Sequence, residues 1–309
     1  MAGILIFSDK TNLALELLTA ANSISSSNGE IKAVTINNDE QAQALSEAGA
    51  NVYRINAADL VLADVSAMAA ALGQAVGELG SDIVLLSSNR RGKELAGRLA
   101  QVIGAGCLTD VNSFETADGK ITCNRNALGG ATVASQYLKA DKQVIAMVPK
   151  SFTPAAGGSG SINDLTVAVK PSAVKLLEVK TKAGDSVDIE AAEVLVAVGQ
   201  GLNSKDDLAM VEELAKLLGG EVACSKPVAT DKKWLSEDRV VGLSGKKCKP
   251  QLAIILGVSG QVQFTVGIRD AKTIVSINTD DNATMNSLSD YVLVSDLHEA
   301  VKAMNTALK

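Results

Sequence analysis

Short clusters of glycine and polar residues follow apolar runs in the second half of the chain. Glycine lets backbone come close to a phosphate, and a helix that begins after such a turn offers N–H donors to an anion. In an open parallel sheet, the ligand lies beyond the carboxyl ends of the strands. The sequence therefore predicts a nucleotide site, with residues 257–260 and the Ser259 hydroxyl as a pyrophosphate cradle and Asn278 and Asp296 near the ribose or adenine. The clusters are Gly199-Gln200-Gly201, Ser225-Lys226, residues 257–260, Asn278 and Asp296.

The same region raises a hydrolase alternative. Ser259, Asp280 and His298 follow one another in the chain order of an α/β-hydrolase triad. However, the nucleophile turn of that fold needs a second glycine where this chain has Gln261. We expect His298 to be a solvated residue at the start of a helix, and we predict no catalytic residue.

Apolar periodicity predicts the elements that hold these clusters. Strands are expected at 194–198, 221–224, 252–256, 273–277 and 291–294, and helices at 204–218, 261–268 and 298–308. Ser204 and Asp207 form a capping box that would start the first of these helices, and Gly219-Gly220 would end it.

The first half alternates strands and helices, which implies right-handed crossovers and a parallel sheet. Strands are expected at 3–7, 31–36, 52–55, 83–87 and 143–148, and helices at 12–24, 39–48, 65–79 and 92–103. Asp118-Gly119 within 114–126 predicts a hairpin. Residues 149–160 are rich in turn formers and predict a surface loop or linker, and 166–180 are expected to be a strand and a connector.

The chain length and composition favour two domains. With 309 residues the chain exceeds one typical core, and we expect domains at 1–185 and 186–309. Aromatic residues make up only 3%, so the core is expected to consist of Val, Ile, Leu and Ala, as in buried parallel strands. The predicted fold class is α/β, with two three-layer domains, mainly parallel sheets and a Rossmann-like C-terminal domain.

Several classes of function are disfavoured. The net charge of −6 and the lack of a basic stripe argue against a nucleic-acid partner. Four cysteines without a CxxC pair and one histidine argue against a metal site. Without a signal-peptide pattern or a long apolar run, we expect a soluble cytoplasmic protein with no membrane insertion.

Three C-terminal segments carry a resemblance to a known family. Residues 251–263, 273–280 and 289–296 strongly resemble the signature region of electron transfer flavoprotein α subunits. Upstream, residues 199–202, 224–227 and 241–245 fit the same template in the same order. Residues 203–208 and Trp234 are most similar to the bacterial FixB-like branch, and 91–96 and Asp110 match in the first half. The resemblance covers the full chain and is most specific in its C-terminal block.

The resemblance implies both a cofactor and partners. Residues 186–309 would form a DHS-like FAD-binding domain, and the N-terminal domain would pack with a β subunit. The αβ heterodimer would carry electrons from a flavin dehydrogenase, of acyl-CoA type or similar, to an acceptor, without being a stand-alone catalyst. By motif position, the FAD contacts would be Gln200, Ser225, Lys226, Val241, Gly242, Leu243, Ser244, Ser259, Gly260, Gln261, Val262, Gln263, Phe264, Asn278 and Asp296.

Four of these positions depart from the family pattern. The family usually has arginine at the positions of Gln200 and Lys226, glutamine at Leu243, and histidine at Phe264, close to the flavin ring. Neither Gln nor Lys copies the planar fork of Arg, and one lost charge-assisted hydrogen bond costs about 1.5–3 kcal/mol. The alternative is therefore an α-like paralogue with weakened or altered FAD or nucleotide binding, acting mainly as a binding or structural subunit. Such a protein would stabilise the reduced, anionic flavin poorly.

Overall fold

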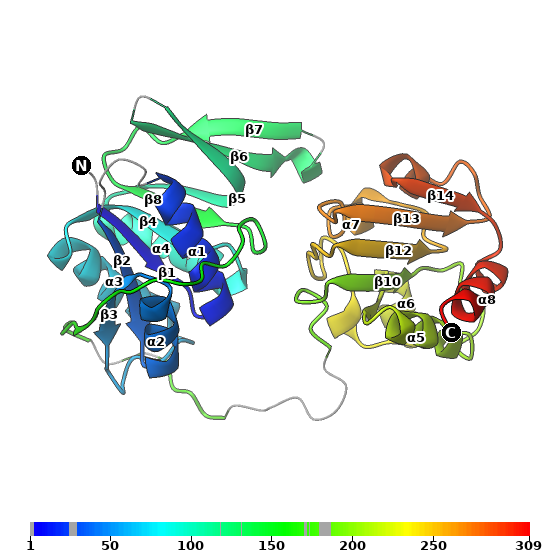
Figure 1. The fold of residues 1–309 in the computed structure, drawn as a ribbon, viewed down its shortest axis with the longest axis horizontal. Helices are drawn as coiled ribbons and strands as arrows, with labels where there is room; N and C mark the ends of the chain where they lie inside the picture. The colour runs from blue at the N-terminus through cyan, green and yellow to red at the C-terminus, as the bar shows by residue number, and fades with distance from the viewer. Residues whose placement is uncertain are drawn as a thin grey trace. The chain divides into compact units, whose positions relative to one another are not determined.

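The computed structural model of the chain describes residues 3–24, 30–117, 119–130, 132–169, 172, 174–178 and 187–309. The chain divides into two compact units, Met1–Val179 and Lys180–Lys309, each an α/β fold (Figure 1). The expected boundary between 185 and 186 falls in a stretch outside the described residues and stays a prediction. No helix in the described part of the chain combines the length and apolar character that a bilayer span requires.

The described residues of the first unit form a nine-stranded sheet in the order β7-β6-β5-β8-β4-β1-β2-β3-β9. Across the sheet from β5 to β9, each strand pairs in parallel with the next, whereas β6 pairs antiparallel with β5 and with β7. The strands are β1 (Gly3–Phe7), β2 (Ile31–Ile36), β3 (Asn51–Ile55), β4 (Ser81–Ser87), β5 (Gly106–Ala117), β6 (Lys120–Ala127), β7 (Thr132–Tyr137), β8 (Gln143–Met147) and β9 (Ile162–Asp164). The helices are α1 (Thr11–Ile24), α2 (Asp39–Glu47), α3 (Val65–Glu78), α4 (Arg90–Ile103) and the 3₁₀ turn η1 (Leu128–Gly130).

Helices cover both faces of this sheet. On β1, Leu5 and Phe7 belong to the core that α3 and α4 cover, whereas Ile4 and Ile6 belong to the core that α1 and α2 cover. Because the strand is buried on both faces, every position needs an apolar side chain rather than every second one. This explains why the central strands can be recognised in the sequence as continuous apolar runs.

The central strands and helices predicted for this unit are confirmed to within two residues. The hairpin is confirmed as well, since Ala117 of β5 lies opposite Lys120 of β6 and Gly119 has a φ of 72°. Asp118, the other predicted turn residue, lies outside the described residues.

Two features of the first unit differ from the prediction. The strand expected within 166–180 is wrong for the residues described there, because the chain pairs with β3 earlier, through Ile162–Asp164. Val167 and Val169 only pack against the core. The additional strand β7 was not predicted, because its side chains are mostly exposed and leave no apolar run to detect.

The second unit has an all-parallel five-stranded sheet in the order β11-β10-β12-β13-β14 among its described residues. The strands are β10 (Val194–Val198), β11 (Glu221–Cys224), β12 (Leu252–Leu256), β13 (Thr273–Asn278) and β14 (Tyr291–Val294), which confirms the predicted set. The helices are α5 (Leu208–Leu217), α6 (Lys226–Thr230), α7 (Val262–Thr265) and α8 (Leu297–Ala307), with the 3₁₀ turns η2 (Glu237–Arg239) and η3 (Thr284–Leu288). Two buried clusters, one on each face of the sheet, make the unit three-layered; α5 and α8 share one of them.

The strand order of the second unit reverses between β10 and β12. The loops that follow these two strands touch through backbone atoms. Gly201 N–H donates to the Gly257 carbonyl oxygen at 3.0 Å, and a Cβ on Gly199 would lie 2.3 Å from the same oxygen. Glycine at 199 is therefore required by the contact between the two loops.

Two helices of the second unit are shorter than predicted. Helix α5 begins at Leu208, so the predicted start at Ser204 is wrong. Asp207 does accept a hydrogen bond from the Ser204 N–H at 3.0 Å, but the pair closes a turn ahead of the helix. Helix α7 ends at Thr265, and the chain then forms turns. In these turns Gly267 lies so close to Gly242 that an added Cβ would be 2.3 Å from the Gly242 nitrogen.

His298 lies at the start of α8, as expected, but its half-buried ring is paired with two carboxylates rather than only solvated. Its Nε2 lies 2.9 Å from Asp207 Oδ2, and its Nδ1 lies 3.2 Å from Asp296 Oδ1. The hydrogen bond to Asp207, with the charges of both carboxylates, raises the pKa of His298, and the contact with His298 lowers the pKa of Asp207. This cluster, which we call the His298 cluster, fastens the start of α8 to the start of α5.

Replacing Gly199 with alanine is expected to destabilise the second unit, because the new methyl group would push apart the loops after β10 and β12. Forced contacts of this kind cost about 1–3 kcal/mol of unfolding free energy. The control is Gly97→Ala in α4, where nothing lies within 4 Å of an added Cβ; alanine should stabilise that helix by about 0.5–1 kcal/mol. Urea unfolding measures both values, and a G199A protein as stable as the wild type would contradict the steric argument.

Replacing His298 with glutamine is expected to remove a pH-dependent part of the stability. Because the folded-state pKa of His298 is raised, its contribution is complete below the unfolded value of about 6.5 and is lost as the pH rises through the folded value. The lowered pKa of Asp207 means that its contribution is present above about pH 3.9 and is lost as the pH falls through the folded value.

Thermal unfolding at about pH 5.5 and about pH 9 tests this expectation, because the two values lie on either side of the histidine titration. H298Q should be clearly less stable than the wild type at the lower pH and should approach it at the higher pH. An equal difference at both pH values would mean that the charge on His298 contributes nothing.

Candidate cofactor-binding site

The carboxyl ends of the five strands of the second unit lie along one edge of the sheet. Backbone hydrogen bonds continue one residue past the strand ends, where the first residue after a strand donates to one of the last two residues of the neighbouring strand: Ser225 N to Val198 O (2.9 Å), Gly199 N to Leu256 O (2.8 Å), Gly257 N to Ile277 O (2.9 Å) and Ser295 N to Asn278 O (3.1 Å). The predicted gathering of the strand-end clusters at one edge is therefore confirmed. We call this the carboxyl edge of the second unit.

The residues predicted to contact FAD differ in how exposed their side chains are. Side chains on the surface are Gln200, Lys226, Leu243, Ser244, Ser259, Gln261, Val262, Gln263 and Asp296; Asn278 is half-buried; Ser225, Val241, Gly242, Gly260 and Phe264 are buried. The exposed side chains can meet a ligand directly, whereas the buried residues shape the loops that present them. Their individual contacts with FAD stay predictions.

Ser225 and Lys226 lie where β11 passes into α6. Ser225 is the buried N-cap residue, and Lys226 is the first helical residue, with an exposed side chain. Pro227 suits the second helical position, because the N–H at the start of a helix has no partner inside it. The sequence thus places an exposed cation at the β11 end of the carboxyl edge.

The predicted segments 241–244 and 259–264 meet in the structure. Leu243 N–H donates to the Gln263 carbonyl oxygen at 2.7 Å, and a Cβ on Gly242 would lie 2.3 Å from that oxygen. Phe264, by contrast, is only 6% exposed and packs in the core with Val241 and Val258. Its burial leaves little ring surface for the predicted place beside the flavin.

Asn278 and Asp296 support the loops around them. The Asn278 side-chain amide donates to the Val258 carbonyl at 3.0 Å, and its oxygen accepts from the Asp280 N–H at 3.1 Å. Asp296 caps α8 through the N–H groups of His298 and Glu299, which hold the pKa of the Asp296 carboxyl below its usual value. Both residues therefore have a structural task at the positions where ribose or adenine contacts are predicted.

Lys232 also contacts this edge, although the sequence did not predict it as a site residue. Its ammonium donates to the carbonyl oxygens of Leu202 (2.7 Å) and Gln200 (3.3 Å), and it lies over the Trp234 ring, 4.2 Å from the centroid. The only available signal is a lysine pair beside the single tryptophan of the chain. That pattern does not reveal that the side chain reaches the turn after β10.

Charge is distributed unevenly along the carboxyl edge. Lys226 and Lys232 lie at the β10 and β11 end, whereas Asp280, Asp281 and Asp296 lie at the β13 and β14 end. A dinucleotide carries its negative charge on the pyrophosphate and presents hydroxyl and ring donors elsewhere. A site with a basic end, exposed amides and an acidic end therefore fits FAD chemically.

The hydrolase triad does not assemble. Both ring nitrogens of His298 face carboxylates of Asp207 and Asp296, so neither nitrogen is available as a base for Ser259. The Asp280 carboxylate instead accepts a hydrogen bond from the Asn282 N–H at 3.0 Å.

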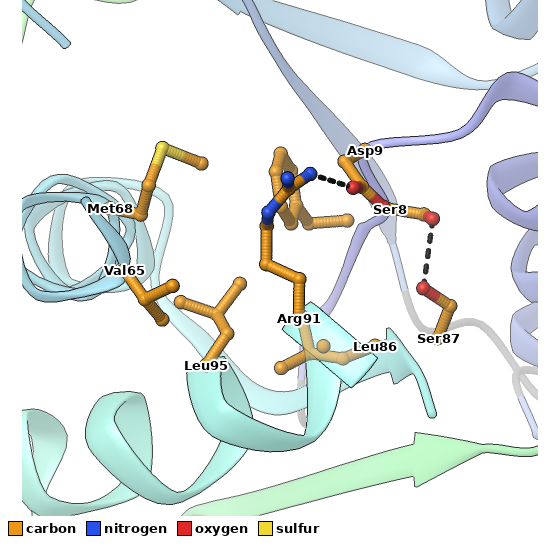
Figure 2. Close-up of a pocket in the computed structure, with 10 residues that line it drawn as sticks. Ser8, Asp9, Val65, Met68, Leu86, Ser87, Arg91 and Leu95 are labelled. Atoms are coloured by element: carbon orange, nitrogen blue, oxygen red, sulfur yellow. Dashed lines mark hydrogen bonds and ion pairs between the residues drawn. The ribbon is translucent and has the colours of Figure 1, made fainter. Parts of the chain in front are cut away.

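The first unit has a comparable reversal of strand order, between β1 and β4. Figure 2 shows the crevice there: Ser8 and Ser87 hydrogen-bond to each other at 2.9 Å, and Arg91 forms an ion pair with Asp9. Val65, Met68 and Leu95 line the apolar side. The cavity measures about 10 Å³, roughly the space of one water molecule. Ser8 pairs with Ser87 and Arg91 with Asp9, and a space of this size has no room for a dinucleotide.

Comparisons with known proteins agree with the geometry. The family described as "Electron transfer flavoprotein domain" matches residues 9–170, and "Electron transfer flavoprotein FAD-binding domain" matches residues 188–269, which include the loops after β10, β11 and β12. Relatives named "Protein FixB" from Escherichia coli (strain K12) and Shigella flexneri are each 32% identical over 311 aligned positions, covering 98% of this chain and 97% of the relative. The chain therefore belongs to the electron transfer flavoprotein family, as an FAD-binding α subunit of the FixB-like branch.

Proposed function

We propose that the chain works as the FAD-carrying half of an αβ heterodimer. It would take electrons from a flavin dehydrogenase, of acyl-CoA type or similar, and pass them to an acceptor, without being a stand-alone catalyst. The observation that carries this proposal is the convergence of five strand-end loops on one edge of the second unit, with two lysines at one end. FAD, when bound, supplies the redox chemistry, while the protein supplies binding, orientation and charge.

The residues that would hold FAD are the exposed donors of the carboxyl edge. Lys226 would pair with an anionic group of the cofactor, and Ser259 and Gln263 would offer hydroxyl and amide hydrogen bonds. The His298 cluster argues against an acid–base role for the single histidine of the chain, because the imidazole is held between two carboxylates.

Exposed apolar strands support a partner chain. All four side chains of the edge strand β14, from Tyr291 to Val294, are between 46% and 66% exposed. On β7, which is also an edge strand, Val133 and Tyr137 are exposed. Exposed apolar side chains on edge strands attract further chains, and a β subunit that covers one or both of these strands would bury this surface.

We place the heterodimer in the cytoplasm. None of the four cysteines, all of which are described, forms a disulfide, and Cys123, Cys224 and Cys248 are buried. Free cysteines are ordinary in a reducing compartment.

The alternative of a paralogue with weakened FAD binding rests on Gln200, Lys226, Leu243 and Phe264. Family membership favours the electron carrier over it. The first three side chains are exposed at the carboxyl edge and lie where they can affect a ligand, whereas Phe264 is buried. The departures therefore bear on how tightly FAD is held.

The full chain, co-expressed with its β subunit, is expected to co-purify as a yellow complex that contains FAD. Lys226→Met should weaken FAD binding by about 1.5–3 kcal/mol, the usual contribution of a hydrogen bond to a charged group. The visible spectrum measures the flavin content, and titration of the FAD-free complex measures the dissociation constant.

The matched control is Lys216→Met. Lys216 is an exposed lysine in the last turn of α5, which leads back from the carboxyl edge to the start of β11. Its loss should leave the dissociation constant unchanged. A well-folded αβ complex that takes up no FAD when FAD is supplied would contradict the proposed function.

A further inference from the structure

Lys232 and the loop after β12 hold one peptide group of the carboxyl edge from opposite sides. The Gln200 carbonyl accepts a hydrogen bond from the Lys232 ammonium at 3.3 Å. The next N–H, that of Gly201, donates to the Gly257 carbonyl at 3.0 Å. The C=O and N–H of a trans peptide point in opposite directions. The Gln200–Gly201 peptide therefore bridges Lys232 and the Gly257 loop, and its orientation is fixed at both ends.

The Lys232 ammonium is itself held in place. It contacts the Leu202 carbonyl at 2.7 Å and lies over Trp234. The backbone around it is tied to α6, since Lys232 N–H donates to Pro227 O (3.0 Å) and Trp234 N–H donates to Val228 O (3.1 Å). Exposed lysines lose much rotamer freedom when they bind a ligand, whereas this side chain has already lost most of it.

The same ammonium puts a positive charge on the turn. Gln200 has an exposed but neutral side chain, so the charge bonded to residues 199–202 comes from Lys232. An ammonium has three N–H donors, and the two carbonyls occupy two of them. The ammonium also lies over the Trp234 ring, and its positive charge stays beside the turn, where it attracts an anionic group at this edge.

We propose that Lys232 is a positioning residue of the FAD site: it orients the Gln200–Gly201 peptide and supplies positive charge that strengthens binding of the anionic cofactor. This inference rests on the proposed function of the second unit as an FAD carrier. Lys232 takes no part in a chemical step.

The test uses the full chain co-expressed with its β subunit, stripped of FAD and titrated with FAD over a range of salt concentrations. Lys232→Met keeps the apolar stem and removes the ammonium. K232M should bind FAD about tenfold more weakly than the wild type at low salt. The difference should shrink as salt screens the lost charge. K232R, which keeps the charge and its donors, should recover most of the affinity.

The matched control is Lys233→Met, which removes the same charge from the neighbouring residue. Among the described residues, the lysine that hydrogen-bonds to residues 199–202 is Lys232 and not Lys233. The K233M complex should bind FAD with a dissociation constant within about twofold of the wild-type value. Thermal unfolding of the FAD-free complexes shows whether each variant remains folded.

Wild-type affinity in K232M, or an equal loss in K233M, would overturn the inference. A loss in K232M that does not change with salt would overturn the role of the charge. If K232M does not fold, K232R decides, because a folded K232R that binds FAD no better than tenfold below wild type would also overturn it. In all these cases the wild type still binds FAD, so the proposed function stands; a wild-type complex that binds no FAD would defeat both.

Discussion

The second unit depends on one constraint, the backbone hydrogen bonding of five parallel strands that continues past the strand ends. Because the strands all run in the same direction, polar clusters far apart in the sequence arrive at one edge. The first residue after β10, β11, β12 and β14 then donates to the end of a neighbouring strand, which ties the start of each of these loops to the sheet. The constraint is tightest between β10 and β12, where Gly199 and Gly257 bring backbone against backbone. The loops after the other strands lie on either side of that contact along the carboxyl edge.

The first unit follows the same topological rule with a different result. Its strand order also reverses, yet the Asp9–Arg91 ion pair and the Ser8–Ser87 hydrogen bond occupy the crevice. Groups that already satisfy one another gain little from a ligand, because binding would only exchange one partner for another. In the second unit, Lys226 stays exposed at the edge. Strand order therefore indicates where a site can be. Whether a site exists depends on the side chains there, such as the exposed Lys226.

Most of the fold could be predicted because its central strands are buried on both faces and so appear as apolar runs; the exposed edge strand β14 happens to be an apolar run as well. Prediction failed where exposure removes that signal, as in β7. It also failed where tertiary contacts override local preference: Asp207 pairs with His298 ahead of α5, and Gly267 packs on Gly242 just past α7. In the site, the strand-end clusters could be predicted because each is local. Lys232 could not, since its role depends on a side chain reaching from the segment after α6 to the turn after β10.

The predicted FAD contacts differ in what they have left to offer a ligand. Asn278 donates one amide N–H to Val258 in the neighbouring loop and accepts from the Asp280 N–H in its own loop, and Phe264 packs its ring in the core. Asp296 is different, because its contacts with His298 and Glu299 all go to Oδ1. A carboxylate accepts several hydrogen bonds through its two oxygens, so Oδ2 can face a ribose while Oδ1 caps α8. Capping and cofactor binding are therefore compatible in Asp296. Asn278 likewise keeps a second amide N–H and a second oxygen lone pair, so it can contact a ligand without releasing Val258 or Asp280.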